Sequence, residues 1–295
     1  MIWLTSRFEI DLSVPRVMGI VNLTPDSFSD GGRHASTVQG LHHAEQLLRD
    51  GADILDVGGE STRPGSPAVP ANEEWRRIED FLREAVRWNV PISVDTYKAE
   101  TMGRALDLGV DIVNDIWALQ QAGALQTVAA HPLCGVCLMH MHRDPQTMQK
   151  APMLGDVVPQ VRDFLEQRAQ ALIQAGVSPA RIVLDYGIGF GKTVEQNFSL
   201  LARQHELLGL GYPLLAGWSR KSSLGAVLAR DGVVPEPAQR QAGSVAAALL
   251  AVQNGAQMVR VHDVRATVDA LRVLHHTGRQ AIPSPGEQGI DRIGS

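Results

Sequence analysis

The sequence of 295 residues places polar side chains at the ends of a series of short apolar runs. They are Asn22, Asp56, Asp95, Asn114, Asp115, His140, Asp185, Ser219 and His262. A single carboxylate of this kind more often caps a helix or joins an ion pair. Several that meet at one place can do more, because a carboxylate accepts two parallel hydrogen bonds from a planar pair of donors. That chemistry suits the guanidine-like edge of a heterocycle.

A second group of residues indicates anion binding. Arg260 and His262 lie two positions apart in one apolar run, so in a strand their side chains point to the same side. Segments 24–32 and 61–67 are rich in hydroxyls and turn-forming residues, as expected of lids over a site. Together they favour a small anion site, although an isolated pair of cations is more often found on the surface.

Two other motifs are weaker. Residues 187–193 (GIGFGKT) resemble a phosphate-binding P-loop, but Tyr186 stands where that motif requires glycine. The glycines are better explained as positions where the backbone passes close to a ligand. His140 and His142 share one face of a strand end, but no third ligand lies nearby in the sequence, which disfavours a metal site there.

The elements that position these residues follow a regular pattern. Segments of helical apolar spacing separate the apolar, β-prone runs, which are 16–22, 53–57, 91–95, 111–115, 135–140, 181–185, 213–219 and 258–262. Repeated strand–helix units predict a parallel sheet, and eight of them predict a (β/α)₈ (TIM) barrel whose strand ends converge on one mouth. We expect one barrel over 16–277, a short hairpin over 1–15 at the barrel bottom, and a poorly ordered tail over 278–295.

Composition excludes several classes of protein. The net charge is −5 and the cations are scattered, so nucleic-acid or anionic-membrane binding is not expected. No run approaches the roughly 18 apolar residues of a membrane span, and the N-terminus lacks the features of a signal peptide, so we expect a cytoplasmic protein. Cys134 and Cys137 have no second pair, and we expect buried structural thiols.

Two longer segments carry a family resemblance. Residues 18–32 (MGIVNLTPDSFSDGG) and 54–65 (ILDVGGESTRPG) resemble the signature segments of the dihydropteroate synthase family, which are pterin-binding barrels. The family's remaining strand ends are matched in order by 93–96 (SVDT), 113–116 (VNDI), 138–141 (LMHM), 189–192 (GFGK), 219–222 (SRKS) and 260–263 (RVHD). The similarity covers about residues 16–275.

The resemblance implies a transferase of folate biosynthesis. Such an enzyme joins (7,8-dihydropterin-6-yl)methyl diphosphate to 4-aminobenzoate, giving 7,8-dihydropteroate and diphosphate. Departure of diphosphate before attack by the amine is implied, as are Mg²⁺, small-molecule substrates, sulfonamide binding and a homodimer.

The resemblance also assigns residues. Catalytic roles are implied for Asp95, Lys221, Arg260 and His262. The pterin would contact Asp95, Asn114, Ile116, Met139, Asp185, Phe190, Gly217 and Lys221. The diphosphate would contact Asn22, Thr62, Arg63, Arg260 and His262, with Asn22 also holding Mg²⁺. The 4-aminobenzoate would contact Phe28, Pro64, Phe190 and Ser222, the last at a helix N-terminus.

Two alternatives stay open, a non-catalytic pterin-binding paralogue and a pterin-dependent methyltransferase barrel. The chain also departs from the family at Tyr186, where proline is usual. We expect this side chain to point away from Asp185. Proline there would then raise stability by about 0.4 to 1 kcal/mol, unless the tyrosine ring packs against a helix and its loss leaves a cavity.

Overall fold

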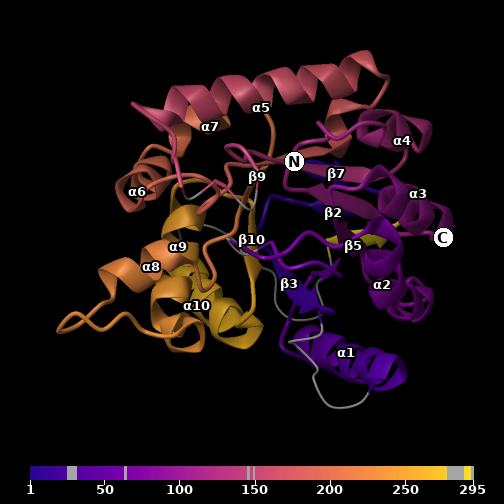
Figure 1. The fold of residues 1–295 in the computed structure, drawn as a ribbon, viewed down its shortest axis with the longest axis horizontal. Helices are drawn as coiled ribbons and strands as arrows, with labels where there is room; N and C mark the ends of the chain where they lie inside the picture. The colour runs from indigo at the N-terminus through magenta and orange to yellow at the C-terminus, as the bar shows by residue number, and fades with distance from the viewer. Residues whose placement is uncertain (25–31, 63–64, 145–146, 149, 278–288, 294–295) are drawn as a thin grey trace.

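Eight parallel strands close into a barrel in the order β10-β3-β4-β5-β6-β7-β8-β9 (Figure 1). The structure, a computed structural model, describes residues 1–24, 32–62, 65–144, 147–148, 150–277 and 289–293. The strands are β3 (Arg16–Asn22), β4 (Ile54–Gly58), β5 (Ile92–Asp95), β6 (Ile112–Asp115), β7 (Gly135–Met139), β8 (Ile182–Asp185), β9 (Leu214–Ala216) and β10 (Met258–Val261). The predicted (β/α)₈ barrel is confirmed.

Helices surround the strands on all sides of the barrel (Figure 1). They are α1 (Gly32–Arg49), α2 (Ala71–Ala85), α3 (Ala99–Leu108), α4 (Ala124–Ala130), α5 (Val157–Gln174), α6 (Val194–Ala202), α7 (His205–Leu208), α8 (Ser222–Val227), α9 (Gln241–Gln253) and α10 (Val264–His276), with 3₁₀ turns η2 (Pro179–Arg181) and η3 (Pro237–Arg240). In α2, Ile78 and Phe81 are fully buried one turn apart, which shows how an amphipathic stripe seats a helix on the strands. Within the described residues, no helix combines the length and apolar character needed to cross a membrane.

An N-terminal hairpin of β1 (Ile2–Leu4) and β2 (Phe8–Asp11) closes the barrel bottom. Its apolar side chains pack against the inward-facing residues at the start of the barrel strands. This cluster contains Trp3, Phe8, Ile10, Leu12, Met18, Ile54, Ile112, Cys137, Val183, Leu215 and Met258. The predicted hairpin is therefore confirmed, and an apolar core fills the barrel interior at this end.

A third strand joins this hairpin. β11 (Ile290–Arg292) pairs antiparallel with β2, so the expectation of a poorly ordered tail is not met for these residues. Arg16 also donates to the carbonyl of Gly289 at 3.1 Å. Residues 278–288 and 294–295 of the predicted tail lie outside the described residues.

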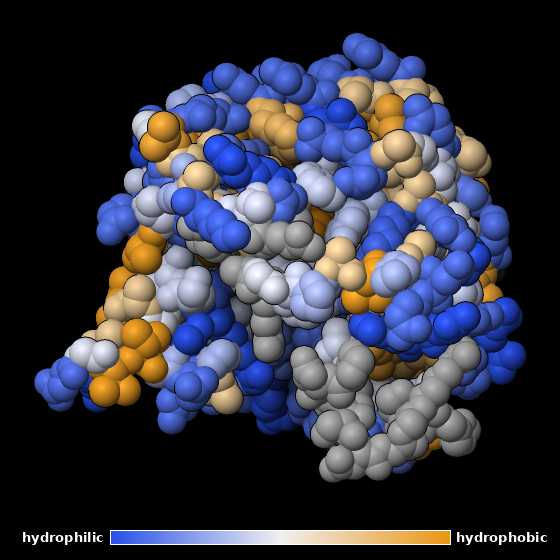
Figure 2. All heavy atoms as spheres, in the orientation of Figure 1, coloured by the Kyte–Doolittle hydropathy of each residue, from blue (hydrophilic) through white to orange (hydrophobic). Residues whose placement is uncertain are grey.

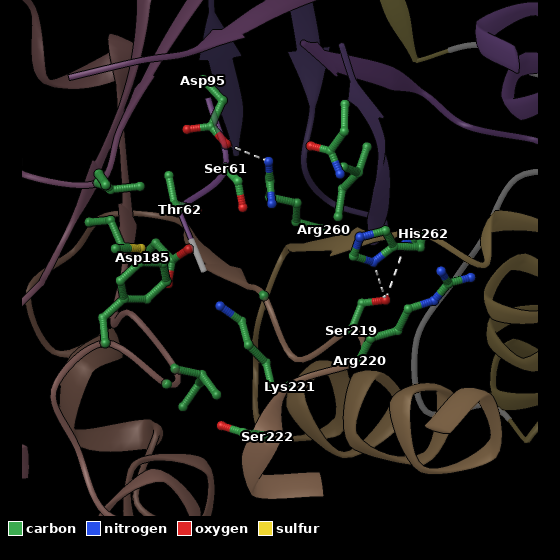
Figure 3. Close-up of a pocket in the computed structure, with 18 of the residues that line it drawn as sticks. Ser61, Thr62, Asp95, Asp185, Ser219, Arg220, Lys221, Ser222, Arg260 and His262 are labelled. Atoms are coloured by element: carbon green, nitrogen blue, oxygen red, sulfur yellow. Dashed lines mark hydrogen bonds and ion pairs between the residues drawn. The ribbon is translucent and has the colours of Figure 1, made fainter. Parts of the chain in front are cut away.

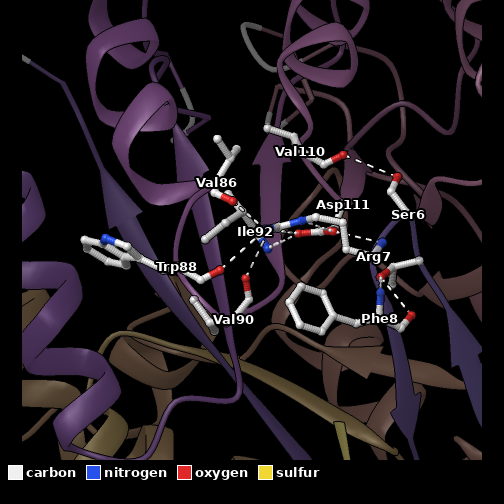
Figure 4. Close-up of polar contacts among 10 residues, drawn as sticks. Ser6, Arg7, Phe8, Val86, Trp88, Val90, Ile92, Val110 and Asp111 are labelled. Atoms are coloured by element: carbon white, nitrogen blue, oxygen red, sulfur yellow. Dashed lines mark hydrogen bonds and ion pairs between the residues drawn. The ribbon is translucent and has the colours of Figure 1, made fainter. Parts of the chain in front are cut away.

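Arg7 fastens the hairpin to the barrel (Figure 4). Its Nη2 lies 2.6 Å from Asp111 Oδ2 and its Nε 2.9 Å from Asp111 Oδ1, and it also donates to the carbonyls of Val86, Trp88 and Val90. Asp111 is fully buried, and burial raises its pKa although Arg7 opposes the shift. The carboxylate therefore depends on this guanidinium.

We predict that Arg7→Met lowers the free energy of unfolding by about 3–5 kcal/mol, because it leaves a buried carboxylate without its cation. Denaturant unfolding measures this. The control is Arg83→Met, which breaks an exposed pair with Glu79 on α2 and costs about 0.5 kcal/mol or less. Equal losses in the two variants would show that the Arg7 clamp does not hold the hairpin.

Candidate active site

A cavity of about 360 Å³ opens at the carboxyl ends of the barrel strands. Every predicted site residue that the structure describes lines it. These are Asn22, Thr62, Asp95, Asn114, Ile116, Met139, Asp185, Phe190, Gly217, Lys221, Ser222, Arg260 and His262. Phe28, Arg63 and Pro64 lie outside the described residues. The structure thus brings distant segments together as predicted, while the role of each residue remains a prediction.

Arg260 pairs with two carboxylates, and Figure 3 shows its contact with Asp95. Its Nε donates to Asp56 Oδ2 and its Nη2 to Asp95 Oδ2, both at 2.6 Å. Asp56 also accepts from Asn114 Nδ2 at 3.1 Å. Burial raises the pKa of Asp95 to about 7; Arg260 opposes the shift and Asp56 adds to it. The charge of Asp95 is therefore set by a balance between its burial and its pairing with Arg260.

Asp56 is one residue whose role the sequence did not reveal. It is fully buried and orients Arg260 and Asn114, two of the predicted ligand-binding residues, yet it does not line the cavity. The available signal was its polar character inside the otherwise apolar strand β4. It acts by positioning its neighbours.

Asp185 and Lys221 face each other across the cavity (Figure 3). The backbone N–H of Gly187 donates to Asp185 Oδ1 at 2.7 Å, and Lys221 Nζ lies 4.2 Å from the centroid of the Phe190 ring. Burial lowers the pKa of Lys221 to about 8, with Asp185 opposing the shift. The same burial raises the pKa of Asp185, while Gly187 and Lys221 lower it. An acceptor and a donor are therefore held ready for a polar ring edge.

Apolar side chains form the walls between these groups. A separate buried apolar cluster lies at the mouth and consists of Ile116, Met139, Met141, Met148 and Phe190. A narrow apolar slot with a few polar groups is the usual design of a site for a small heterocycle. Of this cluster, Met148 lines the cavity and was not predicted.

His262 is held by Ser219. Ser219 Oγ lies 2.9 Å from His262 Nδ1 and accepts from the His262 backbone N–H at 3.1 Å. The neighbouring Arg220 pairs with Asp263 at 2.7 Å. This arrangement fixes the imidazole ring on the same side of the cavity as Arg260 (Figure 3).

The loop after β4 is anchored at its base by Glu60. Glu60 accepts from Tyr97 Oη at 2.8 Å and from the Val69 N–H at 3.2 Å, and it pairs with Lys98. These contacts tie both ends of the loop that carries Thr62 to the adjacent strand end. Glu60 also lines the cavity and was not predicted.

The alternatives based on thiols and histidines are not supported. Cys134 and Cys137 are free, buried thiols, as predicted, and burial raises the pKa of both. His140 Nδ1 lies 2.9 Å from Lys192 Nζ, which is incompatible with a metal on that nitrogen. In the described part of the chain, no three His, Cys, Asp or Glu side chains gather to hold a metal ion.

Tyr186 points away from Asp185 into the outer core, as predicted. Its ring is fully buried, its hydroxyl donates to Gln204 Oε1 at 2.8 Å, and Trp218 Nε1 lies 3.4 Å from the same hydroxyl. The ring therefore fills space that proline cannot fill. This favours the second of the two outcomes considered for Tyr186→Pro, in which loss of the ring costs stability.

The cavity and its barrel define a class, the pterin-binding enzymes. Residues 18–262 match the family described as pterin binding enzyme. The chain is 50% identical over 282 residues to dihydropteroate synthase of Neisseria meningitidis serogroup B, covering 94% of this chain and 98% of that protein.

Solved structures agree with this match. Xanthomonas albilineans dihydropteroate synthase with 4-aminobenzoic acid has a TM-score of 0.85, is 47% identical, and the similarity covers 95% of this chain and 100% of that one. The Burkholderia cenocepacia enzyme complexed with 7,8-dihydropteroate has a TM-score of 0.84 at 47% identity, with 94% and 96% covered. The Yersinia pestis enzyme with a sulfonamide drug has a TM-score of 0.87 at 42% identity, with 94% and 99% covered. The chain belongs to the dihydropteroate synthase family.

We predict that Tyr186→Pro lowers the free energy of unfolding by about 3 kcal/mol or more, because a large buried ring is lost. Tyr186→Phe should cost about 1–3 kcal/mol, since it leaves Gln204 Oε1 buried without its donor. Thermal melting of both variants measures the difference. A melting temperature for Tyr186→Pro at or above that of the parent would contradict the packing role of the ring.

Proposed function

We propose that this chain condenses (7,8-dihydropterin-6-yl)methyl diphosphate with 4-aminobenzoate to give 7,8-dihydropteroate and diphosphate. The observation that carries the proposal is one cavity that combines a carboxylate and an ammonium group, an apolar slot, and an arginine–histidine pair. A methyltransferase barrel would not need that pair, and a non-catalytic paralogue would be expected to lose the lid-loop residues, which this sequence retains at 24–32 and 61–67. The sulfonamide complex of a relative supports sulfonamide binding at the same cavity.

The pterin lies between Asp185 and Lys221. Asp185 accepts from a ring N–H and the 2-amino group, because its two oxygens match that planar pair of donors. Lys221 donates to the carbonyl side of the ring, and Asn114, held by Asp56, bonds a further edge. The apolar cluster at the mouth, together with Gly217, encloses the flat ring.

The diphosphate lies against Arg260, His262, Thr62 and Asn22, and Arg63 completes this set in the proposal. The side-chain amide of Asn22 faces the cavity and makes no hydrogen bond within the described residues, so its oxygen is available to a cation. One protein oxygen, substrate phosphates and water form a normal set of Mg²⁺ ligands. A bound Mg²⁺ would neutralise charge on the leaving group.

Asp95 stabilises positive charge at the pterin methylene carbon as diphosphate departs. Its Oδ1 is buried and has no hydrogen-bond partner among the described residues, so it can act toward a bound ring. Fixed charges in a site that excludes water act strongly on developing charge. The amine of 4-aminobenzoate then attacks, with Phe28, Pro64 and Phe190 enclosing its ring and Ser222 receiving its carboxylate.

A homodimer and a cytoplasmic location are part of the proposal. Support for the dimer comes from four exposed apolar side chains on α8, α9 and the segment between them, which are Val227, Val233, Val234 and Leu250. Figure 2 shows apolar atoms gathered where this segment projects from the surface. Exposed apolar patches commonly mark protein interfaces, and the mass in sedimentation equilibrium tests this one.

The direct test is an incubation of the protein with the pterin diphosphate, 4-aminobenzoate and Mg²⁺. We expect dihydropteroate and diphosphate in equal amounts, and loss of turnover when a chelator removes Mg²⁺. Pterin binding without product would favour the non-catalytic paralogue. Full turnover in the chelator would exclude the proposed metal.

The two ends of the cavity should respond separately to substitution. Asp185→Asn and Lys221→Ala should each weaken binding of a free pterin by about 1.5–3 kcal/mol, the range for hydrogen bonds of charged groups. His262→Ala should lower kcat/KM while leaving free pterin binding unchanged. His262 is a cleaner probe than Arg260, whose loss would leave Asp56 and Asp95 unpaired. If calorimetry and kinetics showed the same loss of free-pterin affinity and of kcat/KM in all three variants, the assignment of separate pterin and diphosphate ends would be contradicted.

The pH dependence of kcat/KM should be bell-shaped, with its maximum between about pH 7 and pH 8. Asp95, whose pKa is raised to about 7, is protonated below that pH and cannot stabilise a cation, so activity rises with pH. Lys221, whose pKa is lowered to about 8, loses its charge above that pH, so activity falls. Asp95→Asn should remove the acidic limb. A profile that is flat from pH 6 to 9 would refute both roles.

A further inference from the structure

Lys192 is a buried cation outside the cavity. It is 3% exposed and lies behind the loop that follows β8, whereas Ile188, Gly189 and Phe190 of that loop line the cavity. Burial lowers the pKa of Lys192 to about 7, with Asp185 opposing the shift. A lysine is almost never fully buried unless its charge is satisfied.

The acceptors around its ammonium group belong to the loop and to the end of β7. Lys192 Nζ lies 2.8 Å from the Gly187 carbonyl, 2.9 Å from His140 Nδ1 and 3.3 Å from the Phe190 carbonyl. An ammonium group has three protons, and these acceptors use all of them. When Lys192 is protonated, His140 accepts at Nδ1 and carries its proton on Nε2, in keeping with the pKa of His140, which burial and Lys192 lower well below the usual value.

The loop forms no strand or helix, and besides Lys192 only scattered hydrogen bonds among the described residues hold it, such as Gly189 N–H to Asn197 Oδ1 at 2.9 Å and Met153 N–H to the Gly191 carbonyl at 2.8 Å. Gly187, Gly189 and Gly191 all have positive φ angles, of 67°, 84° and 71°. A Cβ at Gly187 would lie 1.8 Å from the carbonyl oxygen of His140, so the backbone there passes directly against β7. Lys192 in turn is fixed at the start of α6, where Thr193 and Gln196 form a capping box.

The loop positions two groups at the pterin slot. Its first N–H, at Gly187, donates to Asp185 Oδ1, and its Phe190 ring lies beside Lys221. A shift of the loop would therefore move the acceptor and one wall of the slot together. The hydrogen bonds of Lys192 Nζ go to His140, Gly187 and Phe190, whereas Arg260, His262 and Thr62 lie on other loops of the cavity.

We propose that Lys192 is a positioning residue for pterin binding. The ammonium group of Lys192 holds the 187–191 loop so that Asp185 and Phe190 face the slot. This inference rests on the proposed function, because it takes the pterin to bind between those groups. Lys192 itself touches no substrate.

The test compares Lys192→Met with the parent enzyme. Methionine keeps the length of the side chain but has no proton to donate. We expect the Kd of a phosphate-free pterin, measured by calorimetry, to rise at least tenfold. The Kd of inorganic diphosphate with Mg²⁺ should stay within twofold, because its residues are not on the loop. An unchanged pterin Kd, or equal loss of both ligands, would overturn the proposal.

The matched control is Tyr186→Phe. It removes a buried hydrogen bond from the outer face of the same strand end, so it should lower the melting temperature and leave both affinities within twofold. If the parent enzyme itself fails to bind the pterin, the proposed function fails and the fault does not lie with Lys192.

A measurement on the parent enzyme covers the case in which Lys192→Met does not fold. Nitrogen-15 NMR of His140 should show a bare Nδ1 and a protonated Nε2. A proton on Nδ1 would contradict the Lys192 contact and overturn the proposal.

Discussion

The sharing of one guanidinium by two buried carboxylates determines how the mouth of this barrel is built. Arg260 donates to Asp56 and Asp95 at the floor of the cavity. Withdrawing such charges from water costs several kcal/mol for each ion, and their mutual attraction offsets this only when the geometry is good. The closed strands provide that geometry because they fix the distance between neighbouring inward residues. The apolar core below, completed by the hairpin and β11, supplies stability that the charged layer does not.

The fold was predictable because its signals are local and repeated. Each barrel strand begins within a residue of its predicted start, since the apolar runs and the helical spacing between them are separate and clear. Strand ends were less certain: β9 stops at Ala216, whereas the polar signal extended to Ser219. β11 was missed because a short polar segment becomes a strand only when β2 offers its edge.

Most of the residues that line the cavity were predictable because they stand at or just after strand ends, where the barrel brings them together. The roles of residues that lie outside the cavity lining and hold these side chains in place could not be predicted. Asp56 looked like one more strand-end carboxylate, and Lys192 like the end of a glycine motif, because their roles depend on partners that are distant in sequence. The burial of the Tyr186 ring against Gln204 is likewise a matter of packing that the strand pattern cannot reveal.

The glycine loop after β8 also limits how the site can evolve. A side chain at Gly187 would meet the His140 carbonyl, and one at Gly191 would lie 2.6 Å from His142 Cβ, at backbone angles that other residues rarely adopt. A side chain at either position would therefore deform the loop that carries Phe190 and that contacts Asp185 through the Gly187 N–H. Under the proposed function, the backbone of this loop is thus the part of the site that substitution can change least without altering the shape of the cavity.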